Sequence, residues 1–427
     1  MRNCFLKRFL QISSSSRFLN SSRRNKVSAP FIDKEGETAE SLRENPGFSY
    51  GLNWGLAGKG VIVKDKAFQN LKSSELLAKG ATIAGLPLHV RGTLGGNSTI
   101  SKAQYSKLLK QVTTHISSIS NIFVHDGAIS LSPESDAKVR VISDSPSAIL
   151  SLSRVLWETP TRAVSHDSCP LTVYTATSIS TAVEDIIGLG AQGNNGFIAA
   201  DIERSSLILC GKAFADINGT KLALTALSEP VIFARGGLPL SARLLVSCDS
   251  VVLLFAPENA IQSYSDLLVS ADAGVVLSPQ GVAPLFQTKK LGGINPYRIP
   301  SAVILATSDS SGTIPSISKL SPGQAAYHFL AGYQNGEFVP AYYAKGSSYI
   351  GVLDLAKTLL SKLKQYQVPT FLVNVDGGVE NITGKDLVKL VTSEKVAPFR
   401  LKGGDLQRKY NAFLSYKFQD IPEEFSF

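Results

Sequence analysis

Two stretches of the sequence combine glycine with residue types that bind phosphate in other proteins. The first is Gly-Val-Glu-Asn-Ile-Thr-Gly-Lys-Asp at residues 378–386, which lies between a predicted strand and a predicted helix, as a phosphate loop would. Its glycines are one residue too far apart, Asp386 replaces the hydroxyl that would bind Mg²⁺, and Glu380 would repel an anion. We therefore interpret this stretch as a turn before a helix that Thr383 or Asp386 caps.

The second stretch, at residues 188–193, matches the Gly-x-Gly-x-x-Gly pattern of dinucleotide-binding proteins. That pattern binds pyrophosphate when a buried strand precedes it and a helix follows it. Here Glu184 and Asp185 precede the glycines, and a predicted strand follows them. We therefore interpret this stretch as a loop without a nucleotide.

The histidines and cysteines form no motif of a metal or catalytic site. His125 precedes Asp126 and His166 precedes Asp167, but neighbours on a strand point to opposite faces, so neither pair predicts a charge-coupled dyad. No metal-ligand spacing and no Cys-x-x-Cys pair occurs. The sequence therefore predicts no catalytic, cofactor-binding or metal-binding residue and no cofactor. The other residues considered are His89, His115, His328, Cys4, Cys169, Cys210 and Cys248.

A short apolar run at residues 250–255, Ser-Val-Val-Leu-Leu-Phe, is the strand on which a phosphate site would depend. Its β-branched and large apolar residues predict a strand that is buried on both faces. In α/β proteins a ligand usually binds just beyond the carboxyl end of such a strand. Here that position holds Ala256-Pro257-Glu258-Asn259, where Cβ atoms block a close backbone approach and the carboxylate repels an anion.

The remaining pattern predicts a mixed α/β protein of two domains. Strands and helices alternate unevenly, which favours a mixed over a strictly parallel sheet, and 427 residues suffice for two cores. Predicted strands are residues 121–124, 137–143, 171–176, 196–202, 206–210, 244–247, 251–255, 301–306 and 370–375. Predicted helices are residues 64–79, 102–118, 146–157, 324–330 and 352–363.

The positive charge of the chain is concentrated at its N-terminus. Residues 1–28 contain seven cations and no acid, so removing them from the net charge of +9 leaves +2 for the rest. This leader is rich in Arg and Ser, and its cations interrupt any secretory apolar core, so it predicts a mitochondrial transit peptide. The alternative is a basic arm that stays on the mature protein. The unpaired cysteines suit a reducing compartment such as the matrix.

No apolar run predicts a membrane span, because Arg235, Arg243 and Asp249 interrupt the best candidate, residues 231–255. We expect a transit peptide at residues 1–28 and a linker at 29–45. An N-terminal domain is expected at 46–235 and a C-terminal domain at 236–427.

Residues 301–333 resemble the ATP-type phosphoenolpyruvate carboxykinases. The chain has Ser-Asp-Ser-Ser-Gly-Thr-Ile-Pro-Ser-Ile-Ser-Lys-Leu at residues 308–320, then Gln324 and Tyr-His-Phe-Leu-Ala-Gly-Tyr at 327–333. The family has an Asp, a Gly, Leu-Pro-Pro-Val-Ser-Lys-Leu, a Gln and Tyr-His-Phe-Leu-Ser-Gly-Tyr. Weaker similarity runs from about residue 92 to 391, in the strands at 122–126, 139–142, 196–198, 207–211 and 371–374, and in Gly384-Lys385.

This chain departs from the family where the resemblance implies chemistry. The phosphate loop falls on residues 255–263, with Ile261 at its Lys position and Gln262 at its Thr position. The acidic metal-binding stretch falls near residues 277–280, which contain no acid, and the paired lysines fall near Gly219 and Thr220. The metal-ligand histidine has no counterpart among residues 242–246, nor the arginine of the family's Glu-Arg-Gly between 333 and 346. Loss of several parts of one electrostatic cluster removes most of the catalysis.

The resemblance, with these departures, implies a carboxykinase-like α/β scaffold whose second, mononucleotide-binding-like domain has lost its phosphate loop. The predicted function is a non-catalytic accessory subunit of a mitochondrial assembly, in the matrix or on the matrix side of the inner membrane. Respiratory complexes, ATP synthase and the mitochondrial ribosome remain open, although the near-neutral body disfavours extensive RNA contact. One alternative is an enzyme with residual ATP-dependent carboxykinase or nucleotide chemistry at Gly384-Lys385. Another is a stand-alone protein that binds a small organic acid.

Overall fold

The computed structural model divides the chain into two units, Met1–Gly47 and Phe48–Phe427. The predicted transit peptide and linker lie outside the described residues. Those described are residues 50–82, 91–92, 100–132, 134–158, 164, 167, 170–179, 196–247, 250–256, 268–270, 274–288, 296–334, 336–340, 350–375, 388, 391, 396–400 and 405–426.

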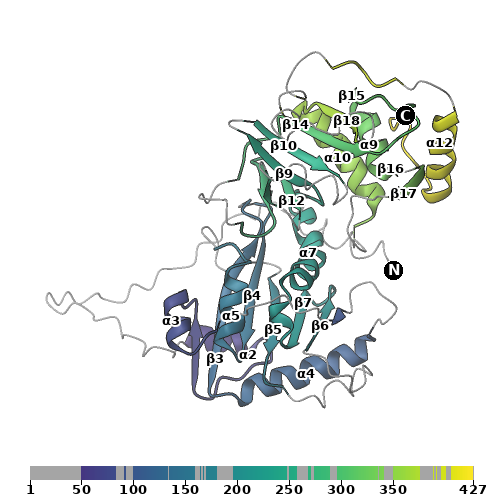
Figure 1. Ribbon diagram of the computed structural model, residues 1–427. Helices are drawn as coiled ribbons and strands as arrows, with labels where there is room; N and C mark the ends of the chain where they lie inside the picture. Colours follow the sequence, from purple (N-terminus) through teal and green to yellow (C-terminus); the bar gives the residue numbers. More distant parts are fainter. Residues whose placement is uncertain are drawn as a thin grey trace, which may run out of the picture. The chain divides into compact units, whose positions relative to one another are not determined.

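The second unit is a mixed α/β structure, which confirms the predicted fold class, and its first half contains a seven-stranded sheet (Figure 1). The strand order is β1-β3-β4-β5-β7-β6-β2. Neighbours are antiparallel between β3 and β4 and between β6 and β7, and parallel elsewhere. The strands are β1 (Lys66–Gln69), β2 (Arg91–Gly92), β3 (Asn121–Ile129), β4 (Ala137–Ser143), β5 (Leu171–Ala176), β6 (Gly196–Asp201) and β7 (Ser206–Gly211).

Helices cover both faces of this sheet because each presents one apolar face to it. One core contains side chains of α3 (Ser73–Ala78), α5 (Pro146–Ser153) and α7 (Ile217–Ala234). The opposite core contains those of α2 (Tyr50–Ala57) and α4 (Lys102–Ser118). In α4, Ser101 caps the first turn and the buried residues recur at helical spacing.

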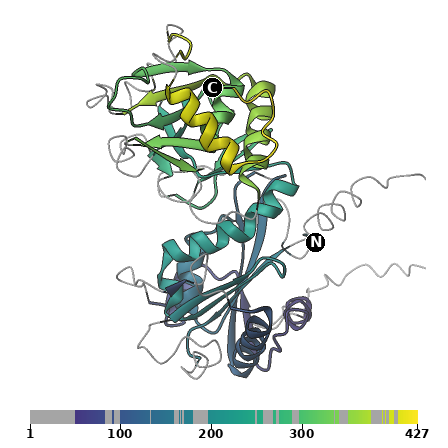
Figure 2. The same ribbon diagram turned by 90° about the vertical axis from the view of Figure 1, so that its right-hand side faces the viewer.

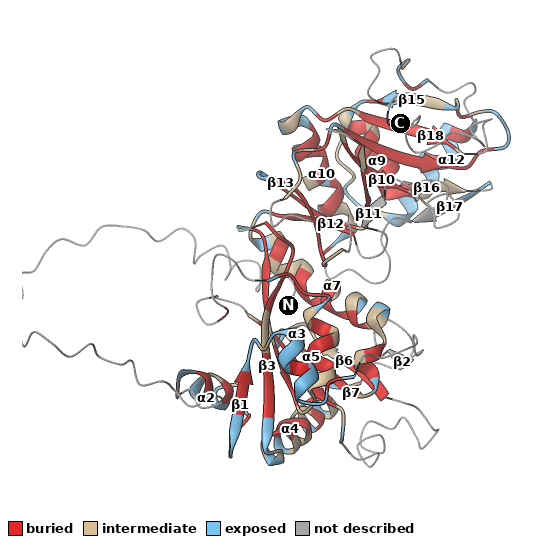
Figure 3. Cartoon of the chain, turned by 60° about the vertical axis from the view of Figure 1, so that its left-hand side comes forward, coloured by how far each residue is buried: buried red, intermediate tan, exposed pale blue. Residues whose placement is uncertain are grey.

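The second half contains a six-stranded sheet with the order β11-β9-β10-β14-β18-β15. β10, β14 and β18 are parallel, whereas the other three strands are antiparallel to their neighbours. Its strands are β9 (Arg243–Ser247), β10 (Ser250–Phe255), β11 (Leu268–Ser270), β14 (Ala302–Thr307), β15 (Ile317–Leu320) and β18 (Thr370–Asn374). The parallel strands β10, β14 and β18 are buried along most of their length (Figure 3).

One face of this sheet packs against α9 (Pro322–Leu330), α10 (Val352–Tyr366) and α12 (Asp405–Lys417) in a single apolar core. α12 lies against β17, where Phe338 and Tyr410 are 4.5 Å apart between ring centroids (Figure 2). The remaining strands are β8 (Leu238–Leu240), β12 (Val275–Ser278) and β13 (Gly281–Pro284) in one small sheet, and β16 (Ala331–Gln334) and β17 (Glu337–Pro340) in another.

The segment that follows β13 joins the core of the first sheet. Leu285 and Phe286 are buried among side chains from that sheet's first core. The Trp157 indole donates a hydrogen bond to the Pro284 carbonyl at 3.2 Å, and the Ser130 N–H donates to Leu285 at 2.8 Å. The predicted boundary at residues 235 and 236 remains a prediction, but this later segment completes the earlier core.

One predicted helix is wrong. Residues 64–79 form β1 and α3, because Phe68 stacks on Phe123 while β1 pairs with β3, and Asn70 with φ of 52° ends the strand. Strand pairing there outweighs the helical spacing of the leucines. No helix in the described ranges is long and apolar enough to cross a membrane.

Candidate functional site

The three parallel strands of the six-stranded sheet end at the same edge, which is where ligands bind in sheets of this kind. Phe255 at the end of β10 lies opposite Leu305, and Thr307 at the end of β14 lies opposite Asn374 at the end of β18. The candidate site therefore comprises Ala256 after β10, residues 307–309 after β14, and Asn374.

Asp309 is the central charged residue at this edge, and it is buried. One carboxylate oxygen accepts hydrogen bonds from the Ser311 N–H at 3.0 Å and the Ser311 hydroxyl at 2.5 Å. The other accepts from the Ile314 N–H at 2.7 Å. Burial alone would raise the pKa of this carboxyl, but these hydrogen bonds outweigh it and lower the pKa. Asp309 is thus an ionised residue that closes the loop at 309–314.

Asn374 holds the same loop from the neighbouring strand. Its amide oxygen accepts from the Asp309 N–H at 2.9 Å, and its amide nitrogen donates to the carbonyls of Asp309 and Ile314. The Thr307 hydroxyl donates to the Tyr333 carbonyl at 2.9 Å. These polar groups therefore bind one another across the ends of β14 and β18.

This arrangement fits a structural clamp better than a metal ligand. Both oxygens of Asp309 accept hydrogen bonds from N–H or O–H donors of its own loop. Within the described part of the chain, no three His, Cys, Asp or Glu side chains form a group that could hold a metal ion. No described residue of this edge is therefore assigned to a cofactor.

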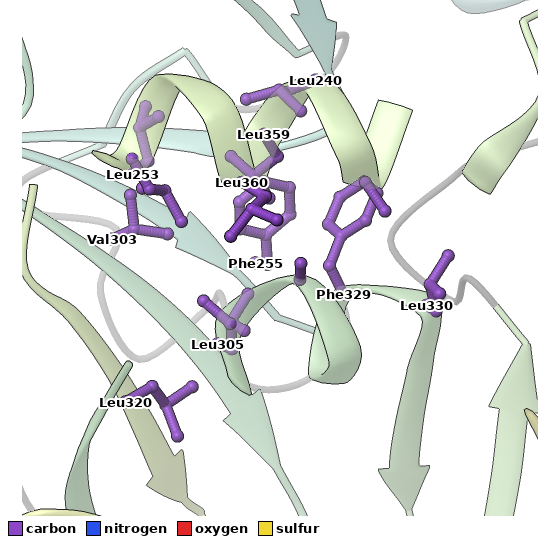
Figure 4. Close-up of a cluster of buried hydrophobic side chains, with 14 of the residues drawn as sticks. Leu240, Leu253, Phe255, Val303, Leu305, Leu320, Phe329, Leu330, Leu359 and Leu360 are labelled. Carbon is purple, nitrogen blue, oxygen red and sulfur yellow. The ribbon is translucent and has the colours of Figure 1, made fainter. Parts of the chain in front are cut away.

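The end of β10 is apolar. Phe255 is buried and meets Phe329 of α9 edge-on, with ring centroids 5.6 Å apart (Figure 4). Ala256 follows at the sheet edge, as the sequence predicts. Ile261 and Gln262, the predicted replacements for the loop lysine and threonine, lie outside the described residues.

The structure changes which strand follows β10. The prediction places the acidic stretch near residues 277–280, because it takes the strand ending there as the first one after β10. Those residues do belong to β12 and the turn after it. However, an unpredicted strand, β11, comes first and lies on β9. Residues 271–273, Ala-Asp-Ala, follow β11, so Asp272 is an acid after the next strand. Its side chain lies outside the described residues.

The glycine stretches at residues 188–193 and 378–386, including Gly384 and Lys385, also lie outside the described residues. His89 and His166 do so as well. Gly219 and Thr220, at the expected position of the paired lysines, form the first turn of α7, where Asp216 accepts a hydrogen bond from the Gly219 N–H.

The described histidines do not form catalytic pairs with their sequence neighbours. Asp126 binds the Arg140 guanidinium through two hydrogen bonds of 2.7 Å, whereas neither ring nitrogen of His125 has a hydrogen-bond partner. Burial lowers the pKa of His125. His328 is buried in α9 between Phe399 and Tyr410, and burial lowers its pKa to about 3. His328 is therefore neutral in the folded protein at physiological pH.

A polar group that the sequence did not predict joins α4 to the end of β5. The Asp144 carboxylate accepts hydrogen bonds from the N–H and hydroxyl groups of Thr177 and Ser178. Nε2 of His115 lies 3.2 Å from Asp144 and 3.0 Å from the Ser178 hydroxyl. A catalytic triad requires the acid and the serine on opposite ring nitrogens. Both use Nε2 here, so the group is not a triad.

A shallow hollow of about 340 Å³ adjoins this group. It is lined by Lys110, Gln111, Thr114, His115 and Ile179. The Thr114 hydroxyl donates to the Lys110 carbonyl, so it is occupied within the helix. No reactive side chain faces this hollow with an activating partner.

A second unpredicted group is a buried ion network. Lys138 Nζ lies 2.7 Å from Asp136, without the alignment of a hydrogen bond, and Arg235 lies 2.6 Å from Asp167. Arg235 also lies 3.4 Å from Asp136. Asp136 and Lys138 are two residues apart, but Asp167 and Arg235 are distant from them in sequence, so spacing gives no signal that all four meet. Two cations and two anions balance, which suits a structural role.

The fold and this sheet edge define a mixed α/β protein whose second half has the layout of a mononucleotide-binding sheet. Residues 284–338, which include β14, β15 and α9, match the family model described as phosphoenolpyruvate carboxykinase. This segment, which includes Asp309, is therefore similar to phosphoenolpyruvate carboxykinases.

Curated relatives support the same relationship over short stretches. The chain is 37% identical over 87 residues to phosphoenolpyruvate carboxykinase (ATP) of Christiangramia forsetii, covering 18% of this chain and 16% of that protein. It is 36% identical over 87 residues to the protein of that name from Leptospira biflexa, with the same coverage. It is 59% identical over 34 residues to that of Flavobacterium johnsoniae, covering 8% and 6%. The chain thus aligns with less than a fifth of the length of each of these relatives.

Proposed function

We propose that this chain is a non-catalytic carboxykinase-like protein that serves as an accessory subunit of a mitochondrial assembly. One observation carries the proposal. β10 runs parallel to β14 and takes the position expected of a phosphate-loop strand. Residues 256–265 after it, Ala-Pro-Glu-Asn-Ala-Ile-Gln-Ser-Tyr-Ser, contain neither glycine nor a cation. A phosphoryl-transfer site needs backbone N–H groups and positive charge at this position.

The state of the neighbouring strand ends supports the proposal. Asp309, which lies in the segment that matches the family model, and Asn374, which lies beyond it, use their polar groups to close the loop at 309–314. Phe255 and Phe329 pack where β10 ends. The residues at this edge of the sheet thereby serve packing and loop closure. Positive charge that could stabilise a transferred phosphoryl group is missing from the residues after β10.

The location and the partners are part of the same proposal. The acid-free, Arg- and Ser-rich residues 1–28 support import into mitochondria. A scaffold that is retained without its chemistry fits a structural subunit bound to other proteins of a complex, with no membrane span of its own. The near-neutral remainder of the chain supports protein rather than nucleic-acid partners.

The test combines ligand binding with native size. Purified chain is heated with and without Mn²⁺ and ATP, beside the carboxykinase of Christiangramia forsetii as a positive control. We expect a ligand-dependent rise of Tm in the control alone, because stabilisation requires binding to the folded state. In native gels of mitochondrial extract we expect the chain in a large complex. Saturable stabilisation of this chain by ATP, or migration as a free monomer, would contradict the proposal.

The alternative is a residual ATP-dependent carboxykinase, which the names of the relatives and the acid Asp272 after β11 support. It would bind nucleotide through Gly384-Lys385. Substitution of Lys385 by Met separates the two functions, because it would abolish ATP binding in a residual enzyme and change nothing in a non-catalytic subunit. The measurement is ATP titration of both proteins with Mn²⁺ present.

A further inference from the structure

A tryptophan is exposed on a helix that carries no charge. The sequence of α2 is Tyr-Gly-Leu-Asn-Trp-Gly-Leu-Ala. Leu52 and Leu56, one turn apart, are buried and attach the helix to the core below the first sheet. Trp54 lies on the other side and is 79% exposed. Because an indole is the largest apolar side chain, its exposure leaves a substantial apolar area in water.

The residues around Trp54 are also small or apolar. Gly51, Ala57 and Gly58 are exposed on the same helix and its final turn. The segment after the helix is held to it by a hydrogen bond from the Val61 N–H to the Leu56 carbonyl. Ile62, the next residue, is 57% exposed. The exposed parts of α2 are visible in Figure 3. Trp54 therefore projects from a helix face of small residues to which another backbone could come close. We call Gly51, Trp54, Ala57, Gly58 and Ile62 the Trp54 face.

Positive charge follows the Trp54 face along the chain. Lys64 and Lys66 are exposed, and Asp65 between them is the one acid from residue 50 to 70. β1, which begins at Lys66, packs beside α2 in the same half of the fold. An apolar centre with a charged border is the composition of a protein–protein interface, in which Trp is enriched among the residues that dominate affinity.

We propose that the Trp54 face binds a neighbouring protein subunit, with Trp54 entering an apolar pocket that acidic side chains border. This inference rests on the proposed accessory-subunit function and names the surface through which it acts. The acidic border follows from the lysines, because opposite charge across an interface steers association. We infer an apolar pocket in the partner because no described residue of this chain covers the Trp54 indole.

Two observations favour a protein over a membrane. A helix that lies in a lipid surface has a broad apolar face and a cationic face in water. α2 has eight residues and no cation, and its other face is buried in the core. Trp54 differs from the other exposed large apolar residues, because each of those has a charged residue within two positions in the sequence. They are Ile62 near Lys64, Leu77 near Glu75 and Lys79, Leu222 beside Lys221, and Tyr416 beside Lys417.

The first experiment measures whether the face is free in the isolated full chain. The chain has two tryptophans, and Trp157 is only 7% exposed. The fluorescence difference between the wild type and Trp54→Phe therefore reports Trp54 alone. We expect efficient quenching of this difference signal by iodide. Protection in the isolated chain would overturn the proposal, since the chain itself would then cover the face. So would a blue shift and protection on adding vesicles of phosphatidylcholine and cardiolipin.

The second experiment measures incorporation into the native assembly. Cells that lack the wild-type copy express the wild type, Trp54→Ala, Lys64→Glu/Lys66→Glu or Tyr416→Ala, and the share of each chain in the large complex is read from native gels. We expect at least a tenfold loss for Trp54→Ala and a smaller loss for the double charge reversal. Tyr416→Ala is the matched control, because Tyr416 is 88% exposed and lies outside the face. It should behave as the wild type.

Each result bears on one proposal or both. Wild-type levels of Trp54→Ala in the complex would overturn the Trp54 face and leave the accessory-subunit function standing. Absence of the wild type from any complex would overturn both. A photo-reactive benzoylphenylalanine at Ala57 provides a readout without truncating Trp54, and it should cross-link to an acidic segment of one subunit. Cross-links to many proteins, or to none in the intact complex, would overturn the inference.

Discussion

The two large sheets of this protein place their polar side chains differently. In the seven-stranded sheet, charged residues lie within or beside the strands and are paired there, as Asp126 is with Arg140 and Lys138 with Asp136. The parallel strands β10, β14 and β18 of the six-stranded sheet contain no charged residue. At their carboxyl ends, the Asn374 side-chain amide exchanges hydrogen bonds with the Asp309 backbone.

This difference separates two uses of polar residues. Ion pairs within a sheet are part of the folded core, and losing one partner leaves a buried charge. The carboxyl ends of parallel strands are positions at which a ligand could take the place of internal partners. In this chain the strand ends keep the layout of a binding site while their polar atoms hydrogen-bond within the protein. Four substitutions test how far each part of the contrast holds.

The largest effect is expected in the seven-stranded sheet. Lys138→Met should lower the free energy of unfolding by about 3–5 kcal/mol, because it removes the cation that lies 2.7 Å from the buried Asp136 carboxylate. Urea denaturation measures this change. The double variant Lys138→Met/Asp136→Asn restores the charge balance and should recover much of the loss. A loss below about 1 kcal/mol for the single variant would show that the pair contributes little.

Removing the carboxylate at the edge of the six-stranded sheet should have a smaller effect. Asp309→Ala removes an acceptor from Ser311 and Ile314, and we expect a loss of about 2–3 kcal/mol. The loss should be equal with and without Mn²⁺, because the carboxylate closes a loop. If Mn²⁺ stabilised the wild type but not the variant, Asp309 would be a metal ligand and the contrast between the sheets would fail.

His328 tests the same half of the molecule through pH. Its pKa is about 3 in the folded state and near 6.5 when unfolded, so between these values the unfolded chain binds the extra proton. Stability therefore falls as pH drops below about 6.5, by about 2 kcal/mol at pH 5 from this residue. His328→Phe retains an aromatic ring and should make this dependence shallower. Unfolding curves between about pH 4 and pH 7 measure this dependence, and equal slopes for the two proteins would contradict the prediction.

The smallest effect, with the opposite sign, is expected at His125. Both of its ring nitrogens are buried without a hydrogen-bond partner, so His125→Leu should raise the free energy of unfolding by about 1 kcal/mol. Thermal unfolding at neutral pH measures it. Asp126→Asn on the adjacent position is the control and should destabilise, because it breaks the pair with Arg140. A decrease in the free energy of unfolding in His125→Leu would show that the imidazole ring makes a stabilising contact.

Local periodicity predicted the elements that present the site. The helix predicted at residues 102–118 has those bounds as α4, and the strands at 251–255, 301–306 and 370–375 correspond to β10, β14 and β18. The pair at 196–202 and 206–210 is the antiparallel β6 and β7. These segments have one strong pattern each. β11 is only three residues long, and no pattern in the sequence reveals it.

The partners within the candidate site could not be predicted, because they depend on distant segments. Asp309 and Asn374 are far apart in sequence, and they meet because β14 pairs with β18. Asp144, His115 and Ser178 come from three separate elements. The resemblance at residues 301–333 lies within residues 284–338, which match the family model. It did not reveal that Asp309 is engaged by its own loop.

The Trp157 contact with Pro284 has a consequence for the order of synthesis. The ribosome delivers Trp157 and the strands of the first sheet well before residues 284–286, which complete that sheet's core. Until then the Trp157 indole N–H lacks its acceptor, and the place of Leu285 and Phe286 is open. The core of the first sheet is therefore complete only once this segment of the second half is present.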